Sequence, residues 1–161
     1  MSKKQNKMAR KSLSELKVGR DFVDVLDSVR LHVNTETIAA AKVLQPEDTG
    51  KVFFINQASA YAITLPDASK AGAGWNAQFI LATVDSNAVT IEATAADGDN
   101  IHGHSIDGED GAAQTVTEGT GVDVITFISG ATKGDRVSLI CDGTSYYVFG
   151  LAADKAHITL T

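Results

Sequence analysis

The chain has 161 residues, of which 43% are hydrophobic and 21% charged, and its formal net charge is −6. This length suffices for one domain with its own core. The single cysteine, Cys141, excludes an intrachain disulfide framework and lies in an apolar run where a thiol serves as a small hydrophobe. No run approaches the ~20 apolar residues that cross a bilayer, so we expect no membrane partner.

The first 20 residues are strongly basic. They carry seven Lys or Arg against Glu15, so the remaining chain holds a charge of −12. This start lacks the apolar segment of a secretory signal, and we expect synthesis and folding in a cytoplasm. We interpret residues 1–35 as a basic N-terminal arm and linker. The arm combines a cationic cluster with a few apolar side chains, namely Lys3, Lys4, Lys7, Arg10 and Lys11, with Leu13, Leu16 and Val18.

The pattern after the arm is that of short strands. The runs "TIAAAKVL" and "KVFFIN" predict two strands joined by a turn at "QPEDTG". The next run, "YAITLP", alternates in polarity and ends at Pro66, which has no N–H to give to a ladder. The runs "AQFILATVD" and "AVTIEAT" predict a hairpin with one face toward a core, the inward residues being Phe79, Leu81, Val89 and Ile91.

The glycine-rich stretch "AADGDNIHGHSIDGEDGAAQ" predicts an excursion of turns at one end of the body. Strand character returns in "DVITFIS", "RVSLICDG", "TSYYVFGL" and "HITLT", and "CDGTS" carries the Asp-Gly signal of a tight hairpin. Seven to nine short strands without a convincing helix predict an all-β fold. We expect residues 36–161 to form an antiparallel β-sandwich or barrel.

The stretch "YAITLPDASKAGAGW" combines a strand end with a small-residue turn and the only tryptophan. Its inward leucine closes the last rung, its proline blocks further pairing, and two glycines let the backbone turn closely around the indole. We therefore predict a structural core and turn unit made of Leu65, Pro66, Gly72, Gly74 and Trp75.

The segment "IHGHS" places His102 and His104 on one side of an extended segment. In a threefold assembly these histidines would offer six nitrogens to one metal, but the sequence supplies no third ligand, and we predict neither a metal site nor a cofactor. The acidic turns "ADGDN" and "DGEDG" do not match the twelve-residue calcium loop. No Gly-x-Ser-x-Gly elbow accompanies the histidines, so we predict that the protein is not an enzyme.

Six segments occur in order within residues 36–161: "PEDTGKVFFIN", "YAITLPDAS", "AGAGWNAQFIL", "AVTIEA", "DGDNIHG" and "KGDRVSLICDGTSYYVFG". This order resembles a β module of tailed-bacteriophage virion proteins. The size and the basic arm resemble a head decoration, or cement, protein in particular. The resemblance implies a structural protein on the outer surface of the virion capsid. Its implied partners are the major capsid protein and itself, as a homotrimer that stabilises the head.

The sequence leaves two rival functions open. A tail or head fibre module would bind a host-surface receptor, and we expect such a site to show exposed aromatic residues in positions 97–114, which contain none. A cellular β-sandwich adhesion domain conflicts with the lack of an export signal. The arm has three interpretations: a virion anchor, which we favour, a solubilising tail, and a nucleic-acid contact. The acidic body and the lack of interleaved aromatics argue against nucleic acid.

Overall fold

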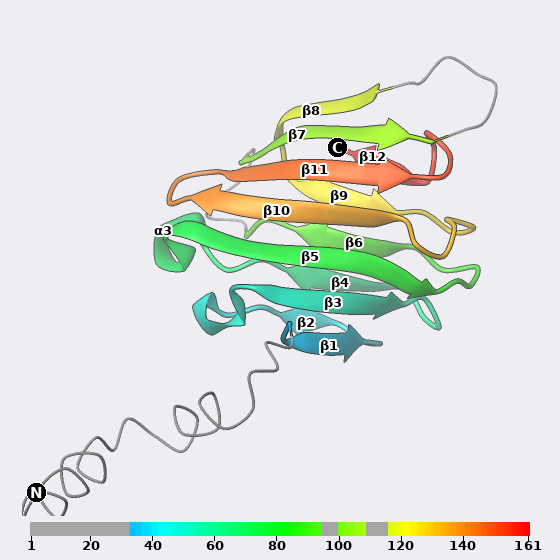
Figure 1. Ribbon diagram of the computed structural model, residues 1–161, viewed down its shortest axis with the longest axis horizontal. Helices are drawn as coiled ribbons and strands as arrows, with labels where there is room; N and C mark the ends of the chain where they lie inside the picture. The colour runs from blue at the N-terminus through cyan, green and yellow to red at the C-terminus, as the bar shows by residue number, and fades with distance from the viewer. Residues whose placement is uncertain (1–32, 95–99, 109–115) are drawn as a thin grey trace, which may run out of the picture. The chain divides into compact units, whose positions relative to one another are not determined.

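The computed structural model describes residues 33–94, 100–108 and 116–161, so the predicted arm residues, from Lys3 to Val18, lie outside the described part. Two β-sheets form the body (Figure 1). The seven-stranded sheet has the order β1 (Thr35–Ile38), β3 (Lys51–Asn56), β5 (Ala73–Thr83), β10 (Arg136–Asp142), β11 (Tyr146–Ala152), β7 (Ile101–Asp107) and β8 (Val116–Val122). The five-stranded sheet has the order β12 (Ile158–Leu160), β9 (Val124–Phe127), β6 (Val89–Glu92), β4 (Tyr61–Thr64) and β2 (Lys42–Val43).

Two single-turn elements interrupt the strands, the 3-10 turn η1 (Pro46–Asp48) and the helix α3 (Ala68–Ala71). The all-β prediction is therefore confirmed for the described residues. The compact unit extends from Val33 to Thr161, and its first strand begins at Thr35, close to the predicted boundary between residues 35 and 36.

The first six strands alternate between the two sheets. Strands β1, β3 and β5 are parallel neighbours in one sheet, and β2, β4 and β6 are parallel neighbours in the other. The chain thus winds through three successive coils, each of which gives one strand to each sheet. The run "TIAAAKVL", predicted as one strand, is divided between β1 and β2 in different sheets.

This winding corrects two predictions. Five of the ten strand pairs in the described part are parallel, so the sheets are mixed and not antiparallel throughout. Strands β5 and β6 also lie in different sheets and form no hairpin, although Phe79, Leu81, Val89 and Ile91 all face the core as predicted. The polarity pattern cannot separate the two topologies, because alternate residues point inward in either case.

The later strands follow the predicted pattern more closely. Strands β10 and β11 form the expected antiparallel hairpin. At its turn, Asp142 Oδ1 accepts the backbone N–H groups of Thr144 and Ser145, both at 2.8 Å, and Gly143 has a φ of +95°. This is the turn chemistry that an Asp-Gly pair supplies.

The prediction of turns throughout the glycine-rich stretch is wrong, because β7 is a seven-residue strand parallel to β11. Gly103 lies in the middle of β7 with a φ of +140°, and a Cβ there would stand 2.0 Å from the Val148 carbonyl oxygen. The glycine therefore permits close approach of two backbones and does not end the strand.

The core lies between the sheets and is filled by the inward side chains of both. Phe53 and Phe79 stack with their ring centroids 5.2 Å apart. Trp75 meets Tyr146 edge to face at 5.7 Å, and the Tyr146 hydroxyl donates to the Pro66 carbonyl at 2.6 Å. The phenol thus ties the strand that precedes α3 to the opposite sheet.

The remaining members of the predicted turn unit lie around this contact. Leu65 is fully buried, and Gly72 and Gly74 have φ values of +78° and +93° on either side of the start of β5. Cys141 is buried, as expected of a small hydrophobic thiol.

A buried carboxylate holds two loops together. Asp135 is 3% exposed and accepts the backbone N–H groups of Thr132 at 2.7 Å and Ala153 at 2.8 Å. Asp135 also contacts the ring of His157, whose Nδ1 atom lies 2.9 Å from Oδ2 of Asp135. These bonds satisfy an otherwise costly buried acid and join the entry of β10 to the segment before β12.

Gly103→Ala should destabilise the body by about 3 kcal/mol or more, since strain at its φ adds to displacement of the paired strand. Gly130→Ala is the matched control, because its φ is +86° and nothing lies within 4 Å of an added Cβ. That change should cost only about 1–2 kcal/mol. Urea denaturation followed by circular dichroism measures both, and equal losses would contradict the close approach at Gly103.

Candidate functional site

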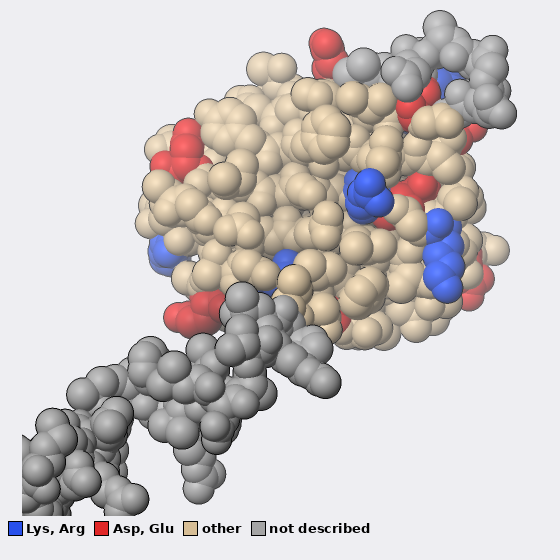
Figure 2. All heavy atoms as spheres, viewed as in Figure 1, with Lys and Arg blue, Asp and Glu red and all other residues tan. Residues whose placement is uncertain are grey.

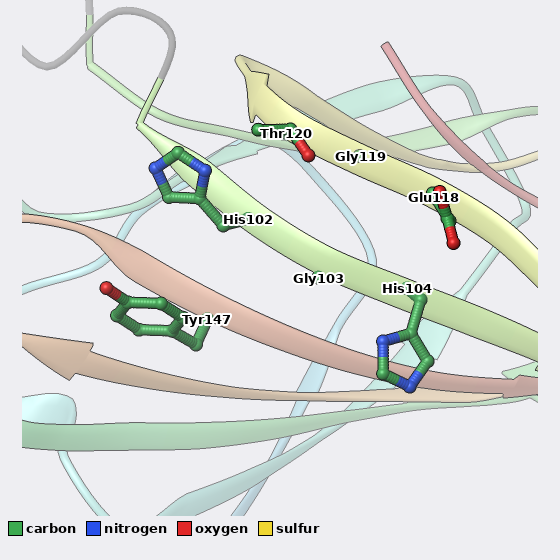
Figure 3. Close-up of a pocket in the computed structure, with 7 residues that line it drawn as sticks. All are labelled: His102, Gly103, His104, Glu118, Gly119, Thr120 and Tyr147. Carbon is green, nitrogen blue, oxygen red and sulfur yellow. The ribbon is translucent and has the colours of Figure 1, made fainter.

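A furrow runs along the outer face of the seven-stranded sheet between β7 and β8, and extends to β11 (Figure 3). It is an open depression with a volume of about 540 Å³, and its lining consists of His102, Gly103, His104, Glu118, Gly119, Thr120 and Tyr147. The two histidines project from the same side of β7, as the sequence predicted for an extended segment. Across the ladder, His102 pairs with Thr120, and His104 pairs with Glu118.

Strand β11 brings Tyr147 into the lining of the furrow and places the Phe149 ring against His104. Tyr147 pairs with His102 and Phe149 with His104. The ring centroids are 5.9 Å apart in the first pair and 5.4 Å in the second, where the rings meet edge to face. Tyr147 is 46% and Phe149 52% exposed. Residues 97–114 contain no aromatic side chain, but β11, some forty positions later in the sequence, places exposed aromatic rings beside the histidines.

Hydrogen bonds fix the orientation of two side chains here. The Gly121 backbone N–H donates to Nδ1 of His102 at 2.9 Å, and the Tyr147 hydroxyl donates to Asp142 Oδ2 at 3.1 Å. The bond to Asp142 raises the pKa of Tyr147 above its ordinary value. The backbone N–H groups of Ser145 and Thr144, together with the tyrosine hydroxyl, lower the pKa of Asp142 below the ordinary value of an aspartate. At neutral pH the phenol is therefore a neutral donor beside a charged acceptor.

Metal ligation has little support in this arrangement. Among the residues that the structure describes, no three His, Cys, Asp or Glu side chains are placed to hold one ion. The Nδ1 atom of His102 is occupied by a backbone donor, which leaves Nε2 as its outward nitrogen. The predictions of no metal and of no enzymatic activity stay predictions.

A second region of interest is the opposite edge of both sheets, which we name the open end. It consists of the edge strands β1 and β2 with the residues beside them, and residues 1–32 join the body here through Val33. Val33 is 60% and Val43 61% exposed, the largest exposed fractions among the described large hydrophobic side chains. Beside Val43 lies a small hollow of about 140 Å³, walled in part by Pro46, Leu65 and Pro66.

Four charges balance one another at the open end. Glu36 contacts the ammonium groups of Lys42 and Lys51, and Lys51 also contacts Asp48. The Lys42 ammonium, assisted by Lys51, lowers the pKa of Glu36. Burial alone would raise the pKa of Asp48, but Lys51 and the Gln45 backbone N–H outweigh it and lower that pKa. Asp48 in turn raises the pKa of Lys51.

Some of the residues predicted from the sequence lie in each of these two regions. His102 and His104 lie in the furrow, and Leu65 and Pro66 lie beside the hollow. The open end itself was not predicted, although Val43 and the flanking lysines are visible in the sequence.

Neither helical element in the described ranges has the length or apolarity to cross a membrane. No model of a known protein family matches this chain, and no curated protein matches it.

The charge cluster predicts a pH dependence of stability. Because the folded pKa values of Glu36 and Asp48 lie below their unfolded values, their contribution is present above about pH 4 and is lost as the pH falls through the folded values. Lys51, whose pKa these two carboxylates raise, belongs to the same ion contacts, so its contribution is lost above about pH 10 and also when the carboxylates are protonated in acid. Glu36→Gln should therefore lower the thermal midpoint at neutral pH, and the difference from the wild type should shrink toward about pH 2.

Thermal denaturation at the two pH values measures this effect. Glu47→Gln is the control, since Glu47 is an exposed acid of the same segment. It should change the midpoint little at either pH. If the deficit of Glu36→Gln is the same at both pH values, the ion contacts do not supply the stability assigned to them.

Proposed function

We propose that this protein is a head decoration protein of a tailed bacteriophage, which binds the assembled capsid shell as a homotrimer and stabilises it. The resemblance of residues 36–161 to phage β modules suggests the class. The observation that carries the proposal is the open end, where unpaired strand edges, two exposed valines and the point of arm attachment coincide. Such an end suits docking on another protein surface.

Charge favours this end over the rest of the body. Residues 33–161 contain 16 acidic and 6 basic side chains, which is a net charge of −10. The open-end cluster is neutral, with two carboxylates and two ammonium groups. Acidic bodies repel one another and any acidic surface, so a neutral end with a basic arm meets the least repulsion on approach to a partner.

Stabilisation in this proposal needs no reaction and no cofactor. Each open end binds the shell weakly through Val43 and the hollow beside it, and the arm adds further contacts. Three such weak binding sites on one homotrimer raise the overall avidity above the affinity of a single site by about 10² to 10⁴ without new contacts. The trimer clamps neighbouring subunits of the major capsid protein from the outer surface of the virion, after synthesis in the host cytoplasm.

Val43→Asp should weaken retention on capsids, since it removes apolar contact and adds a charge that must be desolvated. Loss of one buried valine is worth about 1.5–3 kcal/mol per site, or roughly tenfold to a hundredfold in affinity. Deletion of residues 1–20 should weaken retention as well while leaving the β-body folded. The measurement is co-sedimentation of each variant with undecorated capsids of the parent phage at limiting protein concentration.

Val84→Asp is the matched control, because Val84 is an exposed valine between β5 and β6, outside the open end. It should bind like the wild type. Light scattering on the same samples should give a mass of three chains of 16.9 kDa each. Equal occupancy for Val43→Asp and Val84→Asp would remove the open end from the proposal, and a monomeric wild type would remove the trimer.

A further inference from the structure

We infer that the furrow on β7, β8 and β11 is a binding site for a neutral saccharide. This inference goes beyond capsid decoration and does not depend on it. The furrow lies toward the β8 edge of the seven-stranded sheet, whereas the open end lies at the β1 edge (Figure 1). A body docked through its open end therefore leaves the furrow free for a ligand.

Two glycines lie in the floor of the furrow. Gly103 and Gly119 pair across the ladder, and their backbones form the floor between the two pairs of flanking side chains. Each is required by the packing below it, because a Cβ on Gly119 would stand 2.9 Å from the Leu160 Cβ. The volume of the furrow, about 540 Å³, lies in the range of small-ligand sites.

The exposed Tyr147 ring lines the furrow, and the exposed Phe149 ring lies next to it against His104. Tyr147 and Phe149 project from the same side of β11, about 7 Å apart as two-residue spacing along a strand dictates. The hydrogen bond to Asp142 holds the Tyr147 ring in place, so little side-chain entropy remains to be lost on binding. The C–H face of a sugar ring is apolar and flat, and an exposed aromatic ring buries it well.

The polar groups match hydroxyls, which both donate and accept. Because Nδ1 of His102 accepts a backbone N–H, the neutral ring carries its proton on Nε2 and offers a donor. Glu118 supplies a carboxylate acceptor, and Thr120 supplies a hydroxyl that serves in either role. The lining thus offers both donors and acceptors to one ligand.

Charge selects against other ligand classes. The lining has no Lys or Arg among its described members and includes Glu118, so a phosphate or a carboxylated ligand is repelled. Figure 2 shows that most of this face of the sheet is free of charged side chains. Nucleobases would also stack on the rings, but a nucleic acid would bring its phosphates to an acidic body. A neutral polyhydroxylated ligand fits both the rings and the charge.

Nuclear magnetic resonance tests the inference on the full-length protein. The probes are lactose, maltotriose and chitotriose as neutral saccharides, and sialyllactose as an anionic one, each at about 20 mM, well above the Kd of a millimolar binder. At least one neutral saccharide should shift the backbone amides of Gly103, Gly119 and Thr120 and receive saturation from the protein. No response to any neutral probe, shifts confined to other residues, or stronger binding of sialyllactose would each overturn the inference.

Variants separate stacking from mere loss of structure. Tyr147→Ala should weaken binding by about tenfold or more, while Tyr147→Phe, which keeps the ring, should retain most of it. Thr159→Ala, on the five-stranded sheet, is the control and should leave the saccharide response unchanged. Equal binding by Tyr147→Ala and the wild type would contradict the site. Because no capsid is present, the result is independent of the decoration proposal.

Discussion

Parallel pairing of β7 with β11 is the contact on which the furrow depends. Glycine at positions 103 and 150 permits this pairing. A Cβ on Gly103 would stand 2.0 Å from the Val148 carbonyl oxygen, and a Cβ on Gly150 would stand 2.7 Å from the Ser105 hydroxyl. The pairing places two histidines beside two exposed aromatic rings that lie far away in the sequence. It also leaves β8 as the edge strand that completes the furrow. Strand geometry in this region is thus determined by glycines inside strands.

The opposite end of the body follows a different constraint. Three coils of alternating strands leave β1 and β2 with unpaired edges, and exposed edges invite indiscriminate pairing. The charges of Glu36, Lys42 and Lys51 surround this edge and oppose such pairing, since they would have to be desolvated. Val33 and Val43 remain exposed for a partner that fits them. In the proposed function this partner is the capsid shell.

Local patterns in the sequence predicted much of the fold. The inward residues of β5 and β6, the Asp-Gly hairpin of β10 and β11, and the burial of Cys141 follow from alternation and turn chemistry, which are local properties. The winding between sheets did not follow, because a strand buried on one face has the same polarity pattern in either topology. The prediction that Gly103 is a turn residue is wrong for a related reason, since the role of this glycine depends on Val148, which is distant in sequence.

The candidate sites were predictable only in part. Placing both histidines on one face needed nothing beyond strand periodicity. Their neighbours Tyr147 and Phe149 depend on long-range parallel pairing, which no local signal specifies, although the alternation in "SYYVFG" does indicate an exposed face. The open end likewise depends on which strands lie at the edges. The arm, the trimer and the capsid partner stay predictions that rest on the resemblance and on charge.

We propose that the open end faces the capsid shell and that the furrow, at the other end of the body, faces solvent. Electron microscopy of the decorated particle, at a resolution that separates the strands, tests it most directly. We predict that β1 and β2 lie against the capsid and that His102, His104 and Tyr147 face outward. Density showing the furrow buried against the shell, or the body attached through β8 and β12, would contradict the claim.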